Sequence, residues 1–500
     1  MDIMKFKYII GFLVISLFSS CDTELDLSPS DKVSDSKAYE SLEACESSLA
    51  GTYDSFTSGW FAHYTNQYIF YMPDVMGDDV YVSSTGNYNR FLSAYQYSID
   101  PTSTYTKDPW ANTYSVIDNA NALIEGVSKF PESEKRNNIL GQALAIRAYC
   151  YHFLIRLYAK SYNDAPDSPG VILRTKSNVE PIKRSTVKDA YSLMVDDLTQ
   201  AISNLKESTN KSYIDKRGAE AILARVYLDM GDEKAIDFAE KAASGLTLLS
   251  KELYATEAFS DFNSETIWGF ICTLSDRQSY LAIPSFYYYA DGAHYVDGKV
   301  VYDNVLSGYS SFRVSEDFVK IFDDADVRKK NFPVMANVTP TEYVRYRNGI
   351  ITSKHRSVGG DIGVGAVNYL RASEMYLIIA EVAADKGYYA KAKTALNAVR
   401  GARGLSAYSG TDADLAQEIQ QERRRELFAE GHRFFDIKRR KEILSRYTSY
   451  DPNFPAKNLK EGQWSGIYLK PGADKFLLPI PQDELNANSA LTKADQNPGY

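Results

Sequence analysis

Apolar side chains recur at steps of three and four residues along much of the chain, as they do in amphipathic helices. Over residues 138–158, Leu140, Leu144, Ala148 and Tyr151 fall on one face of such a helix. The chain is therefore predicted to be mainly α-helical. Similar spacing predicts further helices over residues 110–128, 187–205, 216–230, 232–243, 371–385, 388–400 and 412–440.

Two of the predicted helical pairs repeat each other. Ala224 and Gly231 mark a helix and the tight turn after it in the stretch AILARVYLDMGDEKAIDFAEKAA. Ala380 and Gly387 take the same places in LIIAEVAADKGYYAKAKTALNAV. Small residues let paired helices approach closely, and glycine permits the turn between them. The spacing resembles tetratricopeptide repeats, whose helical hairpins stack on one continuous core.

Between the helical blocks, residues 51–110 and 260–368 are rich in Tyr, Asn, Ser, Gly and Asp and show little helical periodicity. We predict long, irregular and partly β loops there, and loops on a rigid scaffold commonly carry binding residues. No Pro/Gly/Ser-rich linker divides the chain, so residues 21–260 and 261–500 are predicted to form one compact unit.

The N-terminus has the pattern of an export signal over residues 1–20. Lys5 and Lys7 precede an apolar run over residues 8–18, which is too short to span a bilayer. The signal ends in LFSSC, which resembles the lipobox of bacterial lipoproteins, in which the cysteine is lipidated. We therefore predict that Cys21 carries a lipid anchor and that the acidic residues after it form a tether.

The charge and the motif inventory exclude several classes of function. The net charge is −9 with basic residues scattered among acidic ones, so nucleic acid is not an expected partner. The five histidines have no metal-ligand spacing, and the chain contains no HExxH, GxSxG or P-loop motif. We predict no enzyme activity, no cofactor and no metal site. The widely spaced Cys45, Cys150 and Cys272 fit neither a disulfide framework nor a metal knuckle.

Two loop-like stretches also lack a functional pattern. Residues 359–366, GGDIGVGA, lack the third glycine of a dinucleotide fingerprint and are predicted to form a flexible loop. Residues 323–330, DDADVRKK, lack the spacing of a calcium loop and are predicted to form a solvated turn. The adjacent Asp78 and Asp79 would point in opposite directions in an extended stretch, which does not favour a glycosidase pair.

Residues 421–440 carry seven basic and four acidic side chains around a thin apolar stripe. Because an unpaired buried charge is far more costly than a paired one, we interpret this cluster as paired charges inside a helical bundle. The stretch ERRRELFAEGHRFFDIKR strongly resembles the hallmark of the RagB/SusD family of Bacteroidetes lipoproteins. Residues 369–384, YLRASEMYLIIAEVAA, and the C-terminal LLPIPQDELNANSALTKADQNPGY resemble two further motifs of that family.

The resemblance implies a SusD-like fold and a protein on the cell surface, anchored in the outer membrane by its lipid. It further implies capture of oligosaccharides and their delivery to a SusC-like TonB-dependent transporter. A peptide-binding member of the same family is the alternative interpretation, and a secreted glycoside hydrolase is a third. The family motifs are architectural, so none of them transfers a ligand-contacting residue to this chain.

The tyrosines indicate where a ligand could bind. The chain has 38 tyrosines against 23 phenylalanines and 4 tryptophans, and many tyrosines fall in the segments predicted to be non-helical. Aromatic faces pack on the C–H groups of sugar rings, and a phenol adds a hydrogen-bonding group. The alternative for each tyrosine is that it packs between loops and helices. The predicted ligand-binding residues are Trp60, Tyr81, Tyr88, Tyr288 and Tyr295.

Overall fold

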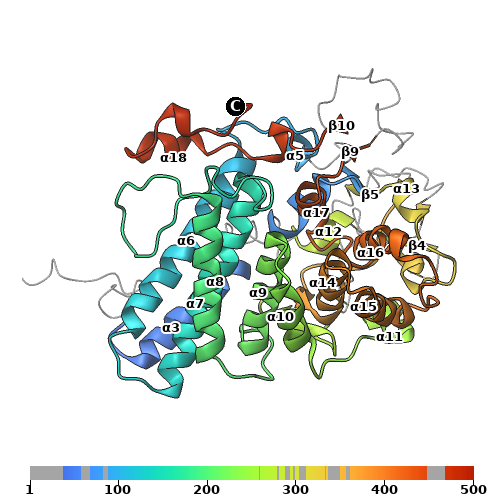
Figure 1. The fold of residues 1–500 in the computed structure, drawn as a ribbon, viewed down its shortest axis with the longest axis horizontal. Helices are drawn as coiled ribbons and strands as arrows, with labels where there is room; N and C mark the ends of the chain where they lie inside the picture. Colours follow the sequence, from blue (N-terminus) through green and yellow to red (C-terminus); the bar gives the residue numbers. More distant parts are fainter. Residues whose placement is uncertain are drawn as a thin grey trace, which may run out of the picture.

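The computed structural model describes most of the predicted mature chain, and its long helices form a continuous row (Figure 1). The described residues are 38–57, 68–82, 88–257, 259–278, 281–287, 293–296, 299–302, 311–332, 334–335, 349–355, 361–446 and 468–500.

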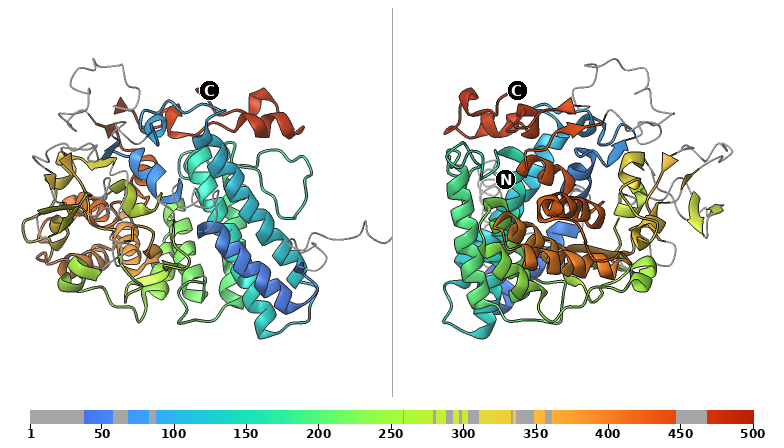
Figure 2. Two further views of the ribbon diagram at one scale, coloured as in Figure 1. Left: turned by 180° about the vertical axis from the view of Figure 1, so that it is seen from behind. Right: turned by 45° about the vertical axis from the view of Figure 1, so that its right-hand side comes forward.

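Each helix of the row packs against its neighbour in the chain, and α10 packs against α14 across the loop-rich segment. Figures 1 and 2 show α3, α6, α7 and α8 on one side of the molecule and α14 to α17 on the other. The row therefore joins the two halves of the sequence. Its members are α3 (Leu42–Thr57), α6 (Thr104–Val127), α7 (Glu134–Tyr158), α8 (Val187–Asn204), α9 (Lys216–Met230), α10 (Lys234–Ala243), α14 (Ala372–Asp385), α15 (Tyr389–Ala402) and α16 (Asp412–Glu426).

Several of these helices begin at a side-chain cap. The Ser133 hydroxyl accepts from the Arg136 N–H at the start of α7, and the Asp215 carboxylate accepts from the Gly218 N–H at the start of α9. Thr186 and Asp189 form a reciprocal capping box at α8. Such caps satisfy amide groups that have no partner inside the helix, which explains why these helices begin where they do.

The two predicted helical hairpins, α9–α10 and α14–α15, are confirmed. Gly231 and Gly387 lie at the two turns with φ of +64° and +79°, a backbone conformation that favours glycine. The second helix of the first hairpin packs on the first helix of the second, as in stacked repeats. The sequence periodicity thus identified both the hairpins and their turns.

Residues 51–110 contain more helix than their composition indicated. Residues 68–75 are helical, and α6 begins at Thr104, where Ser103 caps it, although Pro109 lies inside the helix. The unpredicted α3 ends at Thr57 and buries Cys45 and Phe56 on one face. The solvent-facing and half-buried positions of α3 include three serines and Gly51, which are weaker helix formers than alanine and gave little support for a helix there.

The predicted helix over residues 412–440 is in fact two helices with a turn between them. α16 ends at Glu426, and α17 runs from Arg433 to Arg439. Ala429 and Gly431 adopt φ of +60° and +76°, which a continuous right-handed helix cannot contain. A Cβ on Gly431 would lie 2.1 Å from the Ile69 carbonyl oxygen, so contact with the helix over 68–75 requires both the turn and the glycine.

The remaining elements are short strands and helices outside the row. Thr266–Cys272 (β2) pairs antiparallel with Gly365–Arg371 (β8), and β1 joins a four-stranded sheet in the order β1-β5-β7-β6. The predicted boundary at residue 260 falls just before β2 and stays a prediction. The other elements are β1 (Val80–Val82), β3 (Ala293–Val296), β4 (Lys299–Tyr302), β5 (Phe312–Val314), β6 (Val334–Met335), β7 (Gly349–Ile350), β9 (Leu444–Ser445), β10 (Tyr468–Leu469), α5 (Leu92–Tyr95), α11 (Lys251–Glu257), α12 (Ile283–Tyr287), α13 (Glu316–Val319), α17, α18 (Gln482–Ala487), η1 (Val327–Asn331), η3 (Asp474–Phe476) and η4 (Lys493–Asp495).

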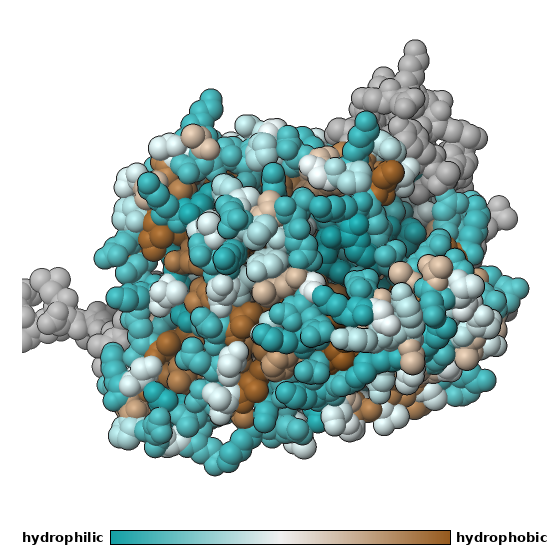
Figure 3. Space-filling view, viewed as in Figure 1, coloured by the Kyte–Doolittle hydropathy of each residue, from teal (hydrophilic) through white to brown (hydrophobic). Residues whose placement is uncertain are grey.

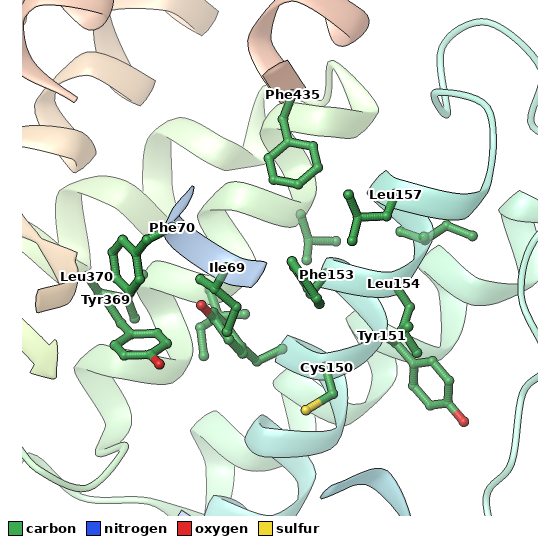
Figure 4. Packing of buried hydrophobic residues seen from close by; sticks show 14 of the residues in the cluster. Ile69, Phe70, Cys150, Tyr151, Phe153, Leu154, Leu157, Tyr369, Leu370 and Phe435 are labelled. Atoms are coloured by element: carbon green, nitrogen blue, oxygen red, sulfur yellow. The ribbon is translucent and has the colours of Figure 1, made fainter. Parts of the chain in front are cut away.

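The hydrophobic core is continuous between the two halves of the chain. In Figure 4, Phe153 of α7 lies between the helix over 68–75 and Phe435 of α17, while Tyr369 of β8 meets Phe70. Aromatic rings meet edge to face at many of these contacts, and such pairs add to the stability gained from burial alone. At the surface, Figure 3 shows hydrophobic residues only as small, separate patches over the helices.

Candidate functional site

The charged stretch at residues 421–440 is structural, as predicted. The Glu426 side chain is fully buried, and its carboxylate oxygens lie 2.5 Å from Arg371 Nη1, 2.7 Å from Arg403 Nη2 and 2.8 Å from Arg328 Nη1. Burial alone would raise the pKa of Glu426, but the guanidinium groups hold it well below its ordinary value. This carboxylate therefore ties together three segments that lie far apart in the sequence.

A second set of polar contacts satisfies the turn between α16 and α17. Lys354 Nζ donates to the carbonyl oxygens of Glu426 at 2.8 Å and of Phe428 at 2.7 Å. The His355 Nε2 atom lies 2.8 Å from the Ala429 carbonyl oxygen. Burial lowers the pKa of His355 to about 4, so the imidazole is neutral at physiological pH and Nε2 carries the donated proton. The turn is thus a fixed part of the core.

The same stretch is also joined to the two residues that precede β1. Arg433 Nε donates to Asp78 Oδ1 and Arg424 Nε donates to Asp79 Oδ1, each at 2.6 Å. The two carboxylates predicted not to form a glycosidase pair are therefore partners of structural arginines. Asp79 is buried and does not face solvent beside Tyr81.

Residues 323–330 are not the solvated turn that the sequence indicated. Asp326 and Arg328 are both buried, and their carboxylate oxygen and guanidinium nitrogen are 2.7 Å apart. Arg328 also contacts Glu422 and Glu426 of α16. The flanking Asp324 and Lys329 remain near solvent. The pair is buried because Arg328 binds Glu426, which lies almost a hundred residues away in the sequence. The sequence of residues 323–330 does not reveal this partner.

The C-terminal motif clamps the end of α7. Asn497 Nδ2 donates to the carbonyl oxygens of Tyr158 at 2.7 Å and of Leu478 at 2.6 Å. Lys438 Nζ donates to those of Arg156 and Ala159, both at 2.6 Å. The last carbonyls of a helix have no partner within it, so Lys438 of α17 and Asn497 satisfy the end of α7, and Asn497 also fixes the C-terminal segment against it.

Of the two predicted ligand-binding residues whose side chains the structure describes, Tyr88 lies at the surface. Its side chain is 71% exposed, and the guanidinium carbon of Arg90 lies 5.4 Å from the centre of its ring. Asn89 and Phe91 share its left-handed backbone conformation, with Phe91 buried beneath. Non-glycine residues persist in that conformation only where the surroundings hold them, which is common at functional sites.

Tyr81 lies in β1 and is only 4% exposed. Strand pairing with β5 places it opposite Arg313, which is buried too. Its ring therefore packs inside the protein and is not presented to a ligand in this structure. Trp60, Tyr288 and the side chain of Tyr295 lie outside the described residues, as does Cys21, so these predictions remain open.

Among the residues that the structure describes, no group of three or more His, Cys, Asp and Glu side chains could hold a metal ion. In that same part of the chain, no helix is long and apolar enough to cross a membrane. Cys45, Cys150 and Cys272 are buried free thiols.

Two family models match different parts of the chain. Residues 334–500 match the model of the SusD family, and residues 26–228 match a family described as starch-binding and associating with the outer membrane. A SusD-like protein of Formosa agariphila is 25% identical over 495 residues, which span 87% of this chain and 92% of that protein.

Solved structures give the same result in three dimensions. A SusD superfamily protein from Bacteroides thetaiotaomicron aligns with a TM-score of 0.78 and 27% identity over 92% of this chain and 100% of its own. A putative sugar-binding protein from Bacteroides vulgatus aligns with a TM-score of 0.76 and 26% identity, over 92% of this chain and 98% of its own. The mainly helical fold predicted from the sequence is confirmed.

Proposed function

Because this chain belongs to the SusD family, we propose that it is a cell-surface binding protein that captures oligosaccharides or polysaccharide fragments. The observation that carries this proposal is the match of residues 26–228 to a family described as starch-binding at the outer membrane. The structural similarity to the putative sugar-binding protein of Bacteroides vulgatus supports the same class of ligand.

Tyr88 offers this function a contact residue. An exposed phenol ring packs on the apolar face of a sugar, and Arg90 beside it can donate hydrogen bonds to hydroxyl groups. The buried Phe91 side chain holds the turn over residues 88–91 against the core, so the exposed Tyr88 ring has a defined position. Trp60, Tyr288 and Tyr295 complete the proposed ligand surface.

Capture at the membrane requires an anchor and a route inward. We assign the anchor to lipidated Cys21, and the route to a SusC-like TonB-dependent transporter that receives the bound glycan. Both assignments rest on the family resemblance and on the lipobox-like sequence before Cys21. Co-purification of the full-length protein with a TonB-dependent barrel from detergent-solubilised outer membranes tests the transporter assignment.

A glycan array followed by calorimetric titration tests the ligand class, with a peptide library measured beside it. We expect saturable binding of an oligosaccharide that is recovered intact after incubation. Binding of peptides without glycans would favour a peptide-binding member of the family. Cleavage of the glycan would contradict the binding function and indicate a hydrolase.

A further inference from the structure

Residues 362–366, within the glycine-rich stretch predicted to be a flexible loop, form one wall of a pocket. The Gly363 carbonyl oxygen accepts from the Gln278 N–H at 3.0 Å, and the Asp361 carboxylate accepts from the Gly363 N–H at 2.8 Å. A Cβ on Gly363 would lie 2.1 Å from the Gln278 carbonyl oxygen. Glycine is therefore required for the close approach of the two backbones, and the stretch has a defined place.

The pocket behind this wall is small, with about 20 Å³ of space for the centre of a water-sized group. A site needs roughly 10–15 Å³ of such space to hold one water, so this pocket suits a group of a few atoms on a larger ligand. Among the described residues, no charged side chain lines it, and the His355 imidazole is neutral. The lining residues that matter here are Phe259, Gln278, Ile283, His355, Val364 and Val367.

Gln278 is the polar exception in this apolar lining. Its side chain is 8% exposed, and its amide nitrogen Nε2 makes no hydrogen bond of good geometry within the described part of the chain. The Cys272 thiol interacts with the Gln278 side chain, but sulfur is a weak acceptor. A buried donor without a full partner is costly, so an acceptor oxygen in the pocket would be stabilised.

The pocket thus combines apolar walls for a methyl group with one donor for an oxygen. An acetyl group carries both features on adjacent atoms and has no charge. We propose that this pocket receives an acetyl group of the captured glycan, with the carbonyl oxygen accepting from Gln278 Nε2 and the methyl group among Phe259, Ile283 and Val367. This inference rests on the proposed glycan-binding function and selects acetylated sugars as its ligands.

Paired oligosaccharides that differ only in acetylation test the inference on the full-length protein. N-acetylated and O-acetylated chains are titrated beside the same chains after deacetylation. One hydrogen bond and one buried methyl group predict at least about tenfold tighter binding of an acetylated chain. The two acetylated series show whether the acetyl group is carried on nitrogen or on oxygen.

Two variants locate the effect. Gln278→Leu removes the donor, and Val364→Phe fills the pocket from its half-buried rim; each should abolish the preference for acetyl groups while leaving the affinity for deacetylated chains unchanged. Gln200→Leu, on the exposed face of α8, is the matched control. Melting temperatures show whether each variant is folded. If neither variant folds, saturation-transfer NMR on the unmodified protein decides, because a pocketed acetyl methyl must receive more magnetisation than the ring protons.

Equal affinity for acetylated and deacetylated chains would overturn the assignment of the pocket and leave the glycan-binding function intact. A preference that survives in both folded variants would also overturn it, as would an acetyl methyl that receives no excess magnetisation. If the protein binds no glycan at all, both proposals are wrong.

Discussion

At the scale of single residues, burial separates tyrosines that the sequence presents as equivalent. Tyr81 and Tyr88 both lie in a polar, aromatic-rich segment, and each neighbours residues able to bind a sugar hydroxyl. The structure buries the first in β1 and exposes the second on a turn. Substitution of Tyr88 should therefore affect glycan binding, whereas substitution of Tyr81 should affect the stability of the fold.

Tyr88→Ala should weaken binding of the best glycan by roughly tenfold to a hundredfold, because a stacking ring is lost, with little change in melting temperature. Tyr81→Ala should instead lower the free energy of unfolding by about 3 kcal/mol, because a large buried side chain is removed from the core. Calorimetric titration and urea unfolding measure the two effects. Unchanged glycan affinity in folded Tyr88→Ala would place the ligand surface elsewhere.

Glu426 gives a second residue-scale prediction. Glu426→Ala leaves the buried guanidinium groups of Arg371, Arg403 and Arg328 without a shared partner, and such a loss commonly costs about 3–5 kcal/mol. Arg424→Ala should cost less, because the Arg424 side chain is partly exposed and its partner Asp79 still lies 3.9 Å from Arg433 Nε. Both variants should lower the melting temperature more than they lower glycan affinity. Abolished binding at unchanged stability would mean that this stretch is a ligand site.

At the scale of elements, local pattern was sufficient for the hairpins and insufficient for the turn between α16 and α17. The hairpins follow from apolar spacing and a glycine within one short stretch. The turn depends on contacts of Lys354, His355 and Ile69 with carbonyls and a glycine far away in the sequence. Nothing in the sequence of residues 421–440 shows these contacts, so a single helix was the natural prediction.

Two glycine substitutions test this difference between a local turn and a tertiary one. Gly387→Ala should cost roughly 1–2 kcal/mol, because only its left-handed conformation is strained and no atom lies within 4 Å of the new Cβ. Gly431→Ala should cost clearly more, because its Cβ would also meet the Ile69 carbonyl oxygen. Urea unfolding compares the two. Equal losses would mean that the second contact is easily relieved.

At the scale of the whole molecule, buried histidines make stability depend on pH. Burial lowers the pKa of both His152 and His355 to about 4, whereas the unfolded chain binds these protons near pH 6.5. Acidification therefore favours the unfolded state in this window. Between about pH 7 and about pH 5, each histidine should remove on the order of 2 kcal/mol from the free energy of unfolding.

The variant His355→Gln should reduce this loss by the share of one histidine, because glutamine takes up no proton in either state. Urea unfolding at the two pH values, with the unmodified protein in parallel, measures the difference. An unchanged pH dependence in the folded variant would show that His355 is not held neutral by its burial.

Membrane attachment is also a property of the whole molecule. Cys21→Ala should leave the melting temperature unchanged and release the protein from the outer membrane, because the acyl chains and not the folded core provide the anchor. Fractionation in a strain without the transporter separates the two modes of attachment. Retention of the variant at the unmodified level in that strain would contradict the lipobox interpretation.

The sequence by itself determined the features that repeat locally. Apolar spacing gave most of the helical row and both hairpins, and the charge pattern at residues 421–440 gave a correct expectation of paired, buried side chains. The residues that form each of these patterns lie within one or two helical turns of each other, so the patterns can be recognised in the sequence alone. Each family motif is likewise a short stretch of sequence, so it too can be recognised without the structure.

Only the tertiary structure decided which partners those residues meet. Glu426 joins arginines from three distant segments, and Asp326 and Arg328 are buried although their neighbours are charged and solvated. The tertiary structure also exposes Tyr88 and buries Tyr81, and it places Gly363 against Gln278 as one wall of a pocket. Burial and pairing depend on which surfaces meet in space, and the order of residues along the chain does not record those meetings.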